Sequence, residues 1–568
     1  MTAVAANTRF DSLVDRLAAL SPRDSPPSSL RDAEPFLDRG AGEVAAACDG
    51  VGVIVGGCLA AVGIATGRLG LLLVAIGTGY AGVVLARSGT LAVVNLRRSR
   101  ALGTAPTIVS RAVLRMRITP AAERAAAFAA ETDGRLGDRL TGRVRRADGT
   151  PRSGLSAFAT AWRDRFPGFY RSLTLVEAAA EAPPEERERT LDRAMNAVLE
   201  GTRERAASAA EALRGPATAV YAFGVLLPLA LIGVLPAAGA AGVDATLPAV
   251  VIVYDMVLPV ALVGAGGWLL SRRPVAFPTD TPTDRTADRR LAVVAGGCAA
   301  VAGAMVAGTV LPWWTRPIAV VGLGVGTGLF VLYRPTIAAR DRTDAFDESL
   351  PDALYLVGRR VSDGVSVERA VADAAEELDG VAGEVFTDAA RRQRRLRVDI
   401  ETAFRGDHGA LEALTSRRAE SAARLFGVAA NAGAPAGRAL IETADHLDEL
   451  RRVETEARRD LGQVTTTLSN TAAFFGPLVG GATVALADSV GTAEALDGSV
   501  PETAGIGLAV GWYVLLLSGV LTALSVGLER GLDRPTIGYR TGAALCAATV
   551  VYLLSFYAAA AVAGAGSL

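Results

Sequence analysis

Residues that could do metal or acid–base chemistry are few in this chain. His408 and His446 are the only histidines and show no HxxxH spacing, so we expect both at solvent-facing helix or loop positions. No pair of cysteines has a CxxC or other ligand-like spacing, and three of the four lie in apolar stretches, where a thiol acts as a small hydrophobe: Cys48, Cys58, Cys298 and Cys546. The sequence therefore predicts no metal site and no disulfide.

Nucleotide hydrolysis lacks its usual signature. No GxxxxGK[ST] loop occurs, and all 58 basic residues are arginines, so a standard Walker lysine cannot be present. With no convergent polar constellation in view, we expect a protein that is not an enzyme and has no cofactor. Any work that it performs must come from a partner.

Asp255 is the acidic residue that lies well inside an apolar stretch. A charged side chain at the centre of a bilayer costs about 2.5–3.5 kcal/mol on insertion scales unless it is paired. Two interpretations stay open: a carboxyl bonded within a helix bundle or near the interface, and a proton or ion pathway.

A run of arginines is a candidate anion-binding site, because clustered positive charges attract anions. It consists of Arg391, Arg392, Arg394, Arg395 and Arg397. Asp399 and Glu401 stand four residues after Arg395 and Arg397, which favours a solvated, salt-bridged helix face. Contact with an acidic partner protein is the next interpretation, and nucleic acid or anionic lipid the last.

Composition indicates a membrane protein. Of 568 residues, 51% are hydrophobic and only 5% aromatic, and mean hydropathy is +0.33, as in chains that alternate lipid-spanning and water-facing parts. Asp11 and Asp15, with no apolar core before residue 50, argue against a signal peptide. Arginine without lysine is typical of a GC-rich genome or of life at high salt and favours a halophilic archaeon.

Nine apolar runs are long enough, or nearly so, to cross a bilayer of roughly 30 Å. They are about 51–67, 69–86, 218–236, 247–270, 291–311, 317–333, 471–487, 505–528 and 541–563. Arginines gather in 271–290 and 529–540, whereas 488–504 carries acidic residues and no arginine. Because basic loops stay inside, we expect a multi-pass protein of the cell membrane with a cytoplasmic N-terminus and an outer C-terminus.

Two long hydrophilic segments, 87–217 and 334–470, show helical periodicity and no strand-like alternation. In the second, Ser349 is predicted to cap a helix that breaks at Asp363-Gly364, and Ser366 to cap the next. The stretch RRQRRLRVDIETAF is predicted to form one long helix, and another to run from 437 into the seventh span. The fold class is therefore all-α, with two cytoplasmic helical bundles.

The two halves of the chain resemble each other. VGGCLAAVG at 55–63 recurs as AGGCAAVAG at 295–303, and Pro106, Arg115 and the triplet Glu123-Arg124-Ala125 match Pro351, Arg360 and Glu368-Arg369-Ala370 at an offset of 245. Each half also ends in a span with a central proline, Pro228 or Pro477. We interpret this as an internal duplication. The predicted parts are a cytoplasmic N-terminal segment (1–50), hairpin 1 (51–86), a first cytoplasmic helical domain (87–217), hairpin 2 (218–270), an Arg-rich linker (271–290), hairpin 3 (291–333), a second cytoplasmic helical domain (334–470) and three C-terminal spans (471–563).

Two passages carry a family resemblance. FDESLPDALYLVGRRVSDGVSVERAVADAAEEL resembles the opening helical hairpin of the type II secretion system F family, the inner-membrane platform of type IV pilus, type II secretion and archaellum machines. FFGPLVGGATVALA resembles the closing span of that family. The match is strongest over 346–480, and the first half is a fainter copy whose turn reads Ile118-Thr119-Pro120, without glycine. The nine-span layout is similar to the archaeal branch.

This resemblance implies a non-catalytic platform whose cytoplasmic bundles dock on a hexameric secretion ATPase and whose spans extract pilin-like subunits for a growing filament. It also implies contact with membrane lipid and a possible homodimer, and no nucleic acid. Candidate partner-contact residues lie on the two hairpins: Arg115, Glu123, Arg124, Arg359, Arg360, Gly364, Glu368 and Arg369. The alternative is that these eight residues only cap helices or carry ordinary surface charge.

Asp255 and the duplication also suit a rival class, a secondary transporter or permease. A signalling receptor is the third possibility, and it lacks a sizeable outer domain that could bind a ligand. The kind of filament, pilus, archaellum or secretion pseudopilus, does not follow from the sequence.

Overall fold

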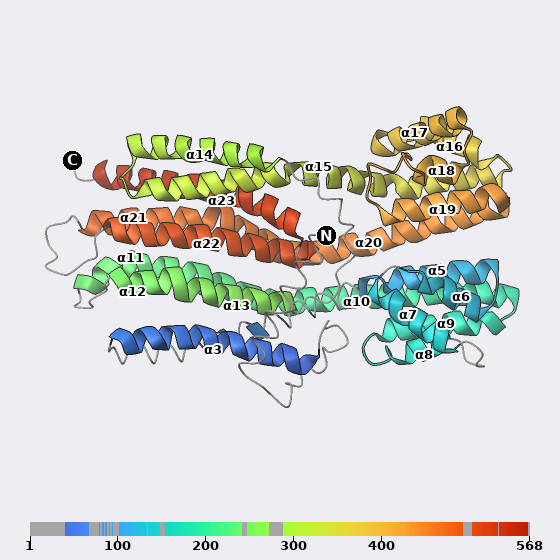
Figure 1. The fold of residues 1–568 in the computed structure, drawn as a ribbon, viewed down its shortest axis with the longest axis horizontal. Coiled ribbons are helices and arrows are strands. Elements are labelled where there is room, and N and C mark those ends of the chain that lie inside the picture. The colour runs from blue at the N-terminus through green and yellow to red at the C-terminus, as the bar shows by residue number, and fades with distance from the viewer. Residues whose placement is uncertain are drawn as a thin grey trace.

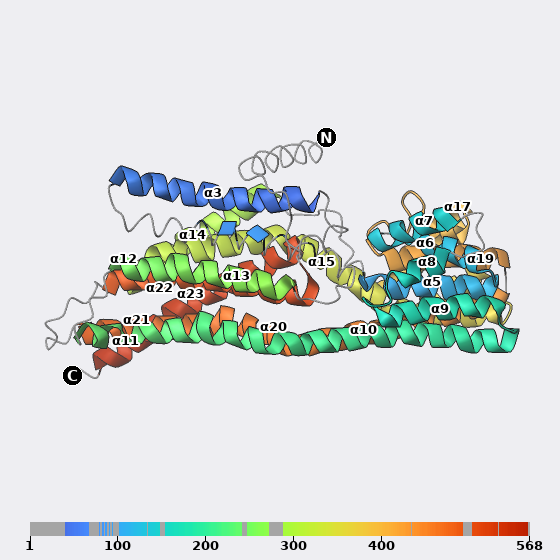
Figure 2. The same ribbon diagram turned by 90° about the horizontal axis from the view of Figure 1, so that it is seen from below.

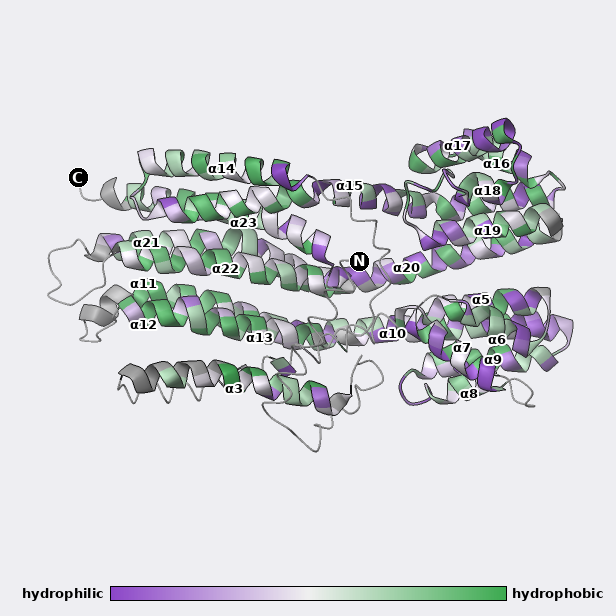
Figure 3. Ribbon diagram, viewed as in Figure 1, coloured by the Kyte–Doolittle hydropathy of each residue, from purple (hydrophilic) through white to green (hydrophobic). Residues whose placement is uncertain are grey.

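The computed structural model describes residues 40–66, isolated positions between 79 and 94, and 102–132, 134–147, 154–240, 247–271, 288–432, 434–491, 503–531 and 533–565. About nine tenths of these described residues are helical and none lies in a strand, which confirms the all-α class. The molecule is elongated, with apolar helices at one end and two more polar bundles at the other (Figures 1 and 3).

Seven helices within the described residues are long and apolar enough to cross a membrane, so the chain is a multi-pass membrane protein. They are Pro184–Val234, Leu247–Leu270, Arg289–Val310, Thr315–Ser362, Leu461–Ser489, Ala504–Arg530 and Arg534–Val562. Each overlaps one of the last seven predicted spans. Residues 51–66 of the predicted span 51–67 lie in α3 (Ala41–Thr66), which is not among the seven, and most of 69–86 lies outside the described residues. The number nine stays a prediction.

Small residues let the apolar helices approach to backbone contact. A Cβ on Gly296 of α14 (Arg289–Val310) would lie 2.6 Å from the carbonyl oxygen of Gly324 on α15 (Thr315–Ser362). In the N-terminal half, a Cβ on Gly79 would lie 3.2 Å from the Cα of Gly56. Gly56 and Gly296 hold the same place in the two Gly-Gly-Cys stretches, so both copies mark a close helix crossing.

Prolines explain three irregular turns within the apolar helices. Each π-helical turn ends two residues before a proline: η2 (Ala222–Leu226) before Pro228, η3 (Ile252–Val257) before Pro259, and η4 (Thr471–Phe475) before Pro477. In each case the residue before the proline donates its backbone N–H to the carbonyl five residues earlier. The proline ring clashes with the carbonyl four residues back, and the wider turn relieves this clash; the N–H that proline lacks is not replaced by the turn.

Two tyrosines satisfy backbone groups next to the first of these turns. Pro228 cannot donate to the carbonyl of Gly224, and the buried hydroxyl of Tyr513 donates to that oxygen instead. The hydroxyl of Tyr254 donates to the carbonyl of Pro228 at 2.6 Å, and the two rings meet edge to face with centroids 5.6 Å apart. Since hydrocarbon offers no donor, these bonds fix how α22 (Thr503–Arg530) packs on the proline-containing helices.

The first bundle contains five helices and the start of a sixth, which surround a buried apolar core. They are α5 (Ala105–Ile118), α6 (Ala122–Ala130), α7 (Arg135–Ala147), α8 (Gly154–Thr160), α9 (Pro167–Glu181) and α10 (Pro184–Tyr221). The second bundle has its own core, formed by the end of α15, α16 (Val367–Glu377), α17 (Gly380–Leu396), α18 (Ile400–Arg405), α19 (Arg417–Ala432) and α20 (Ala434–Asn470).

The helices of the two bundles follow the same order at nearly constant spacing. α7 and α17 begin 245 residues apart, α8 and α18 end 245 residues apart, and η2 and η4 begin 249 residues apart. The shared order extends the short sequence matches over both bundles.

In the part of the chain that the structure describes, three helices connect the bundles to the apolar layer without a break. α10 continues through η2 into α11 (Leu227–Ala240), and α20 continues through η4 into α21 (Gly476–Gly491), as expected for the second of these from the sequence. α15 runs from the apolar layer into the second bundle as one helix (Figure 2). The other apolar helices of the described residues are α3, α14, α22, α23 (Arg534–Ala565), and α12 (Leu247–Val251), which continues through η3 into α13 (Leu258–Ser271).

Two local predictions in the second bundle were wrong. Ser349 caps nothing: it lies inside α15, and its hydroxyl donates to the carbonyls of Ala345 and Phe346 at 3.2 and 3.1 Å, because tertiary packing carries the helix through Pro335 and Pro351. RRQRRLRVDIETAF is two helices, since Arg397 adopts a left-handed conformation after α17.

The break after α17 also removes the predicted salt bridges from Arg395 and Arg397 to Asp399 and Glu401, because the residues no longer share one helix. Asp399 instead caps α18 by accepting from the N–H of Thr402 at 2.7 Å, and this hydrogen bond lowers the pKa of its carboxyl. The predicted cap at Ser366 is confirmed, with 3.4 Å to the N–H of Arg369.

Candidate functional site

The second hairpin carries five of the predicted contact residues. Gly364 has a φ of +87° in the turn between α15 and α16, a conformation that a residue with a Cβ adopts only with strain. Arg359 and Arg369 are exposed on either side of the turn, and Glu368 is half-buried. The turn lies at the end of α15 away from the spans (Figure 1), where a partner can reach it.

Arg360 has a structural partner. Its guanidinium forms an ion pair with Glu377 and lies 3.9 Å from Asp373, both on α16. This contact ties the two arms of the hairpin together. Arg360 is therefore a brace within the hairpin, whereas its neighbour Arg359 remains available at the surface.

The first hairpin uses a different arginine for the same purpose. Arg111 of α5 bonds to Glu131 at 2.9 Å and to the carbonyl of Phe128 at 3.0 Å, and its guanidinium lies 4.3 Å from the centroid of the Phe128 ring. The predicted contact residues of this hairpin are half-buried (Arg115) or exposed (Glu123 and Arg124). The sequence match of Arg115 with Arg360 thus does not extend to the brace.

An ion-pair network joins the two bundles, and the sequence analysis missed it. Arg117 of α5 binds Asp192 and Glu442, both at 2.7 Å, and Glu188 at 3.1 Å. Asp192 and Glu188 lie on α10, whereas Glu442 lies on α20 of the other bundle. A single half-buried guanidinium therefore links three helices from both bundles.

A second arginine repeats this arrangement farther along α20. Arg203 of α10 binds Glu449 at 2.6 Å and Glu456 at 3.4 Å. Glu442, Glu449 and Glu456 stand seven residues apart, so they form one stripe along α20. The stripe is visible in the sequence, but the arginines that face it come from another domain and follow no local pattern.

Apolar packing accompanies these charges. Val453 of α20 is buried in the core of the first bundle, and Leu450 packs against the same core. Leu440 and Ala444, earlier on α20, belong to the core of the second bundle. α20 therefore contributes to the cores of both bundles.

His446 lies on α20 close to Arg117, which corrects its predicted solvent-facing position. Burial lowers the pKa of its imidazole, and the positive charge of Arg117 lowers that pKa further. A neutral imidazole is thus favoured between the bundles. His408 is exposed, as expected.

A buried ion pair fastens the base of the second bundle to the C-terminal spans. Arg340 of α15 binds Asp533 in the turn between α22 and α23, and the two side chains are only 2% and 8% exposed. Arg340 also donates to Thr536 at 2.7 Å. Burial alone would raise the pKa of Asp533, but the hydrogen bonds from Arg340 and Thr536 and the charge of Arg340 bring it below its usual value.

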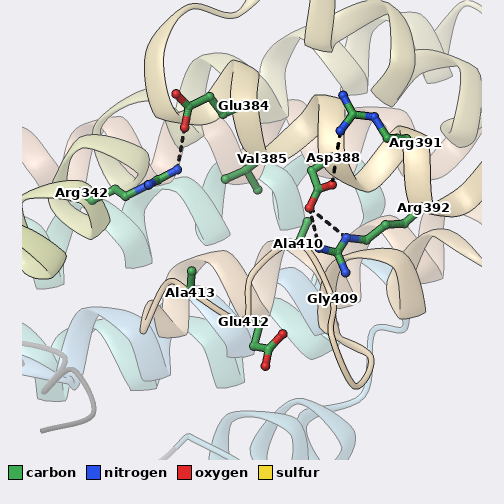
Figure 4. A pocket seen from close by; sticks show the side chains of 10 residues that line it. All are labelled: Arg342, Glu384, Val385, Asp388, Arg391, Arg392, Gly409, Ala410, Glu412 and Ala413. Carbon is green, nitrogen blue, oxygen red and sulfur yellow. Dashed lines mark hydrogen bonds and ion pairs between the residues drawn. The ribbon is translucent and has the colours of Figure 1, made fainter. Parts of the chain in front are cut away.

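A surface groove of about 440 Å³ lies beside α17 (Figure 4). Arg342 and Glu384 face each other across 2.6 Å on its wall, and Arg392 binds Asp388 at 2.8 Å. Arg391 also points to Asp388 (Figure 4). Five of its six charged side chains pair with one another, and this pairing disfavours capture of a small anion.

The described residues contain no group of three His, Cys, Asp or Glu side chains that could hold a metal ion. Comparison with known protein families, curated proteins and solved structures found no match to this chain.

Proposed function

We propose that this protein is a non-catalytic membrane platform of a type IV pilus-like assembly or secretion machine. Its bundles lie in the cytoplasm, bind a hexameric secretion ATPase, and pass the motion of that ATPase to spans that extract and polymerise pilin-like subunits. The resemblance over 346–480 and the all-α, multi-pass architecture support this role.

One observation carries the proposal: α10, α15 and α20 run unbroken between the bundles and the apolar layer. Each helix is continuous over this length and can carry a displacement along its axis, with Pro216, Pro335 and the wide turns η2 and η4 as points where it can bend. With α20 shared by both cores, force applied to either bundle reaches several spans together. Such mechanical linkage is what a platform needs and an enzyme does not.

Co-purification with the ATPase tests this role directly. The double variant Arg359→Glu/Arg369→Glu reverses two exposed charges at the second hairpin, and we expect it to reduce ATPase capture at least about tenfold. Arg424→Glu, an exposed position on α19, is the matched control and should bind normally. Equal capture by both variants, or none by the unmodified protein, contradicts the proposal.

The cytoplasmic position of the bundles needs its own experiment. Protease added to sealed, right-side-out vesicles should leave 334–470 intact and cut it once the vesicles are opened. Cleavage by protease added outside would place the second bundle on the outer side of the membrane, where a cytoplasmic ATPase cannot bind it.

A transporter or permease that uses Asp255 is the second candidate. Its carboxyl oxygen Oδ1 is buried and accepts no hydrogen bond, an arrangement that a coupling ion could exploit. The variant Asp255→Asn distinguishes the two candidate functions. Loss of substrate uptake in cells that still assemble filaments would favour the transporter.

A further inference from the structure

Four exposed arginines lie at one end of the membrane spans. Arg289 and Arg290 begin α14, Arg334 lies on α15, and Arg534 begins α23. Within the part of the chain that the structure describes, none of the four forms an ion pair. Their positive charges are therefore available to a ligand.

The three helices that carry these arginines pack on one another at the same level. A Cβ on Gly328 of α15 would lie 3.5 Å from the carbonyl oxygen of Ala292 on α14, and one on Gly538 of α23 would clash with the ring of Tyr333 on α15. Ala292 and Gly538 each follow an arginine by about one turn, and Tyr333 directly precedes the third. α14 and α23 both begin at the end of the apolar layer that faces the bundles (Figures 1 and 3). The four charges therefore gather at one end of the spans.

Two carboxylates at this end of the spans bind other arginines. Asp533 pairs with Arg340. Glu529 pairs with Arg540 at 2.8 Å and with Arg530 at 3.6 Å. These ion pairs leave the four exposed arginines without the neutralisation that their neighbours have.

The starts of α14 and α23 also favour an anion. Neither helix has an acidic residue in its first turn, where the macrodipole attracts negative charge and disfavours arginine. Asp288 precedes α14, and its carboxylate accepts the backbone N–H of Arg290 at 3.1 Å. An anion bound at this level would face the positive ends of both helices as well as the guanidinium groups.

Exposed apolar surface continues from the arginines into the span. Leu291, Val293 and Val294 of α14 follow the first two arginines directly and are 59%, 74% and 61% exposed. Tyr333 and Tyr539 lie at this end of α15 and α23, as tyrosines do where a helix passes from hydrocarbon to headgroups. A ligand that covers this surface has an anionic head and an apolar tail.

We propose that the four arginines and the apolar start of α14 bind an anionic membrane lipid through its phosphate headgroup. Lipid surrounds the spans of any membrane protein, and clustered arginines next to a span select anionic headgroups. An acidic protein in the cytoplasm would meet the arginines but not the apolar side chains within the span. The site does not depend on whether the protein is a platform or a transporter.

Lipid retention by the full chain tests the site. The protein is reconstituted in vesicles of phosphatidylcholine and phosphatidylglycerol at about three to one. It is then extracted in mild detergent, and the lipids that stay bound are quantified by mass spectrometry. We expect phosphatidylglycerol to be enriched over the vesicle ratio at least about fivefold, the effect of one arginine near an anionic headgroup. Retention at the vesicle ratio would overturn the proposal.

Replacement of the four arginines by glutamine locates the enrichment. With Arg289→Gln, Arg290→Gln, Arg334→Gln and Arg534→Gln combined, the retained lipid should return nearly to the vesicle ratio. The control variant carries glutamine at four exposed arginines of the second bundle that also lack an ion pair among the described residues: Arg359, Arg395, Arg424 and Arg438. It loses the same charge and should keep the enrichment. Equal losses in the two variants would show that net charge, and not this site, selects the lipid.

Two half-sets keep the test decisive if the full set fails to insert, since arginines that flank a span also orient it. Arg289→Gln/Arg290→Gln and Arg334→Gln/Arg534→Gln each leave two of the charges in place. We expect each to lower the enrichment by about half or more. Unchanged enrichment in both half-sets would overturn the proposal.

Inorganic phosphate distinguishes a lipid site from a site for a free anion. At equal ionic strength, phosphate and chloride should displace the same amount of phosphatidylglycerol, because the lipid is also held by its tail. Displacement by phosphate well beyond that by chloride would identify a free-phosphate site and contradict the proposal.

Discussion

The two bundles share an order of helices but contribute opposite charges to their common interface. The first supplies the arginines, Arg117 and Arg203, and the second supplies the stripe of Glu442, Glu449 and Glu456. Two identical copies would present the same charge to each other at equivalent positions. The bundles therefore present complementary charges to one another, and these ion pairs join them.

The two hairpins also differ, in the conformation of the turn and in the arginine that joins the two helices. The second turns at Gly364 with positive φ, whereas the first turns through Thr119 with extended backbone (φ −141°, ψ 106°). The braces also differ, Arg360 with Glu377 in one and Arg111 with Glu131 in the other. The two bundles keep the same helix order, whereas the backbone conformation of the turn and the arginine–glutamate pair differ between the two hairpins.

The largest expected effect concerns how the second bundle is fastened to the spans. Arg340→Leu leaves Asp533 buried without its partner, so we expect a loss of about 3–5 kcal/mol in unfolding free energy, read as a lower unfolding temperature in detergent. Arg342→Leu removes an exposed ion pair with Glu384 and should cost at most about 1 kcal/mol.

The double variant Arg340→Leu/Asp533→Leu sharpens the comparison. Removing both charges avoids an unpaired buried carboxylate, so it should recover much of the stability lost in the single variant. A double variant as unstable as Arg340→Leu would show that Arg340 acts through packing and not through its charge.

The interface between the bundles should give an intermediate effect. Arg117→Ala leaves three carboxylates without their shared cation, and we expect a loss of about 1–3 kcal/mol. Hydrogen exchange of α20 amides is the appropriate measurement, because local opening shows there before global unfolding. Protection should fall in α20 and α10 but not in α17. The exposed pair Arg452 and Asp448 supplies the control Arg452→Ala, and uniform loss of protection would argue against a distinct interface.

The two turns should respond differently to alanine. Gly364→Ala places a Cβ at φ +87° and should cost about 1 kcal/mol, measured by thermal unfolding. Thr119→Ala, in the first hairpin, changes no strained backbone and should cost less. If the two substitutions were equally costly, backbone conformation would not be what separates the hairpins.

The sequence predicted features that depend on local spacing. Seven apolar runs, the turn at Gly364 and the cap at Ser366 all follow from composition or from contacts within a few residues. The π-helical turns could have been anticipated from Pro228, Pro259 and Pro477, but a proline alone permits a kink as readily as a wide turn.

Features that depend on distant partners were missed. Ser349 looked like a cap because the apolar run after it begins there, yet packing carries α15 through that point. Arg117 and Glu442 are 325 residues apart in the chain, and the bond between Arg340 and Asp533 joins residues 193 apart. No local pattern distinguishes these arginines from those on the surface.

The smallest effect expected is a pH dependence of the interface through His446. Its pKa is lower in the folded protein than in the unfolded chain, so below about pH 6.5 the unfolded chain binds a proton that the folded protein does not. Stability at the interface is therefore complete at neutral pH and falls as the pH drops from about 6.5 toward the folded pKa. His446→Gln should flatten that part of the pH profile of α20 hydrogen exchange, whereas His408→Gln, at an exposed position, should leave it unchanged. Carboxylates near the ring, Asp192 and Asp445, oppose the effect of Arg117. A profile that stays steep in His446→Gln would show that His446 is not the source of the pH dependence.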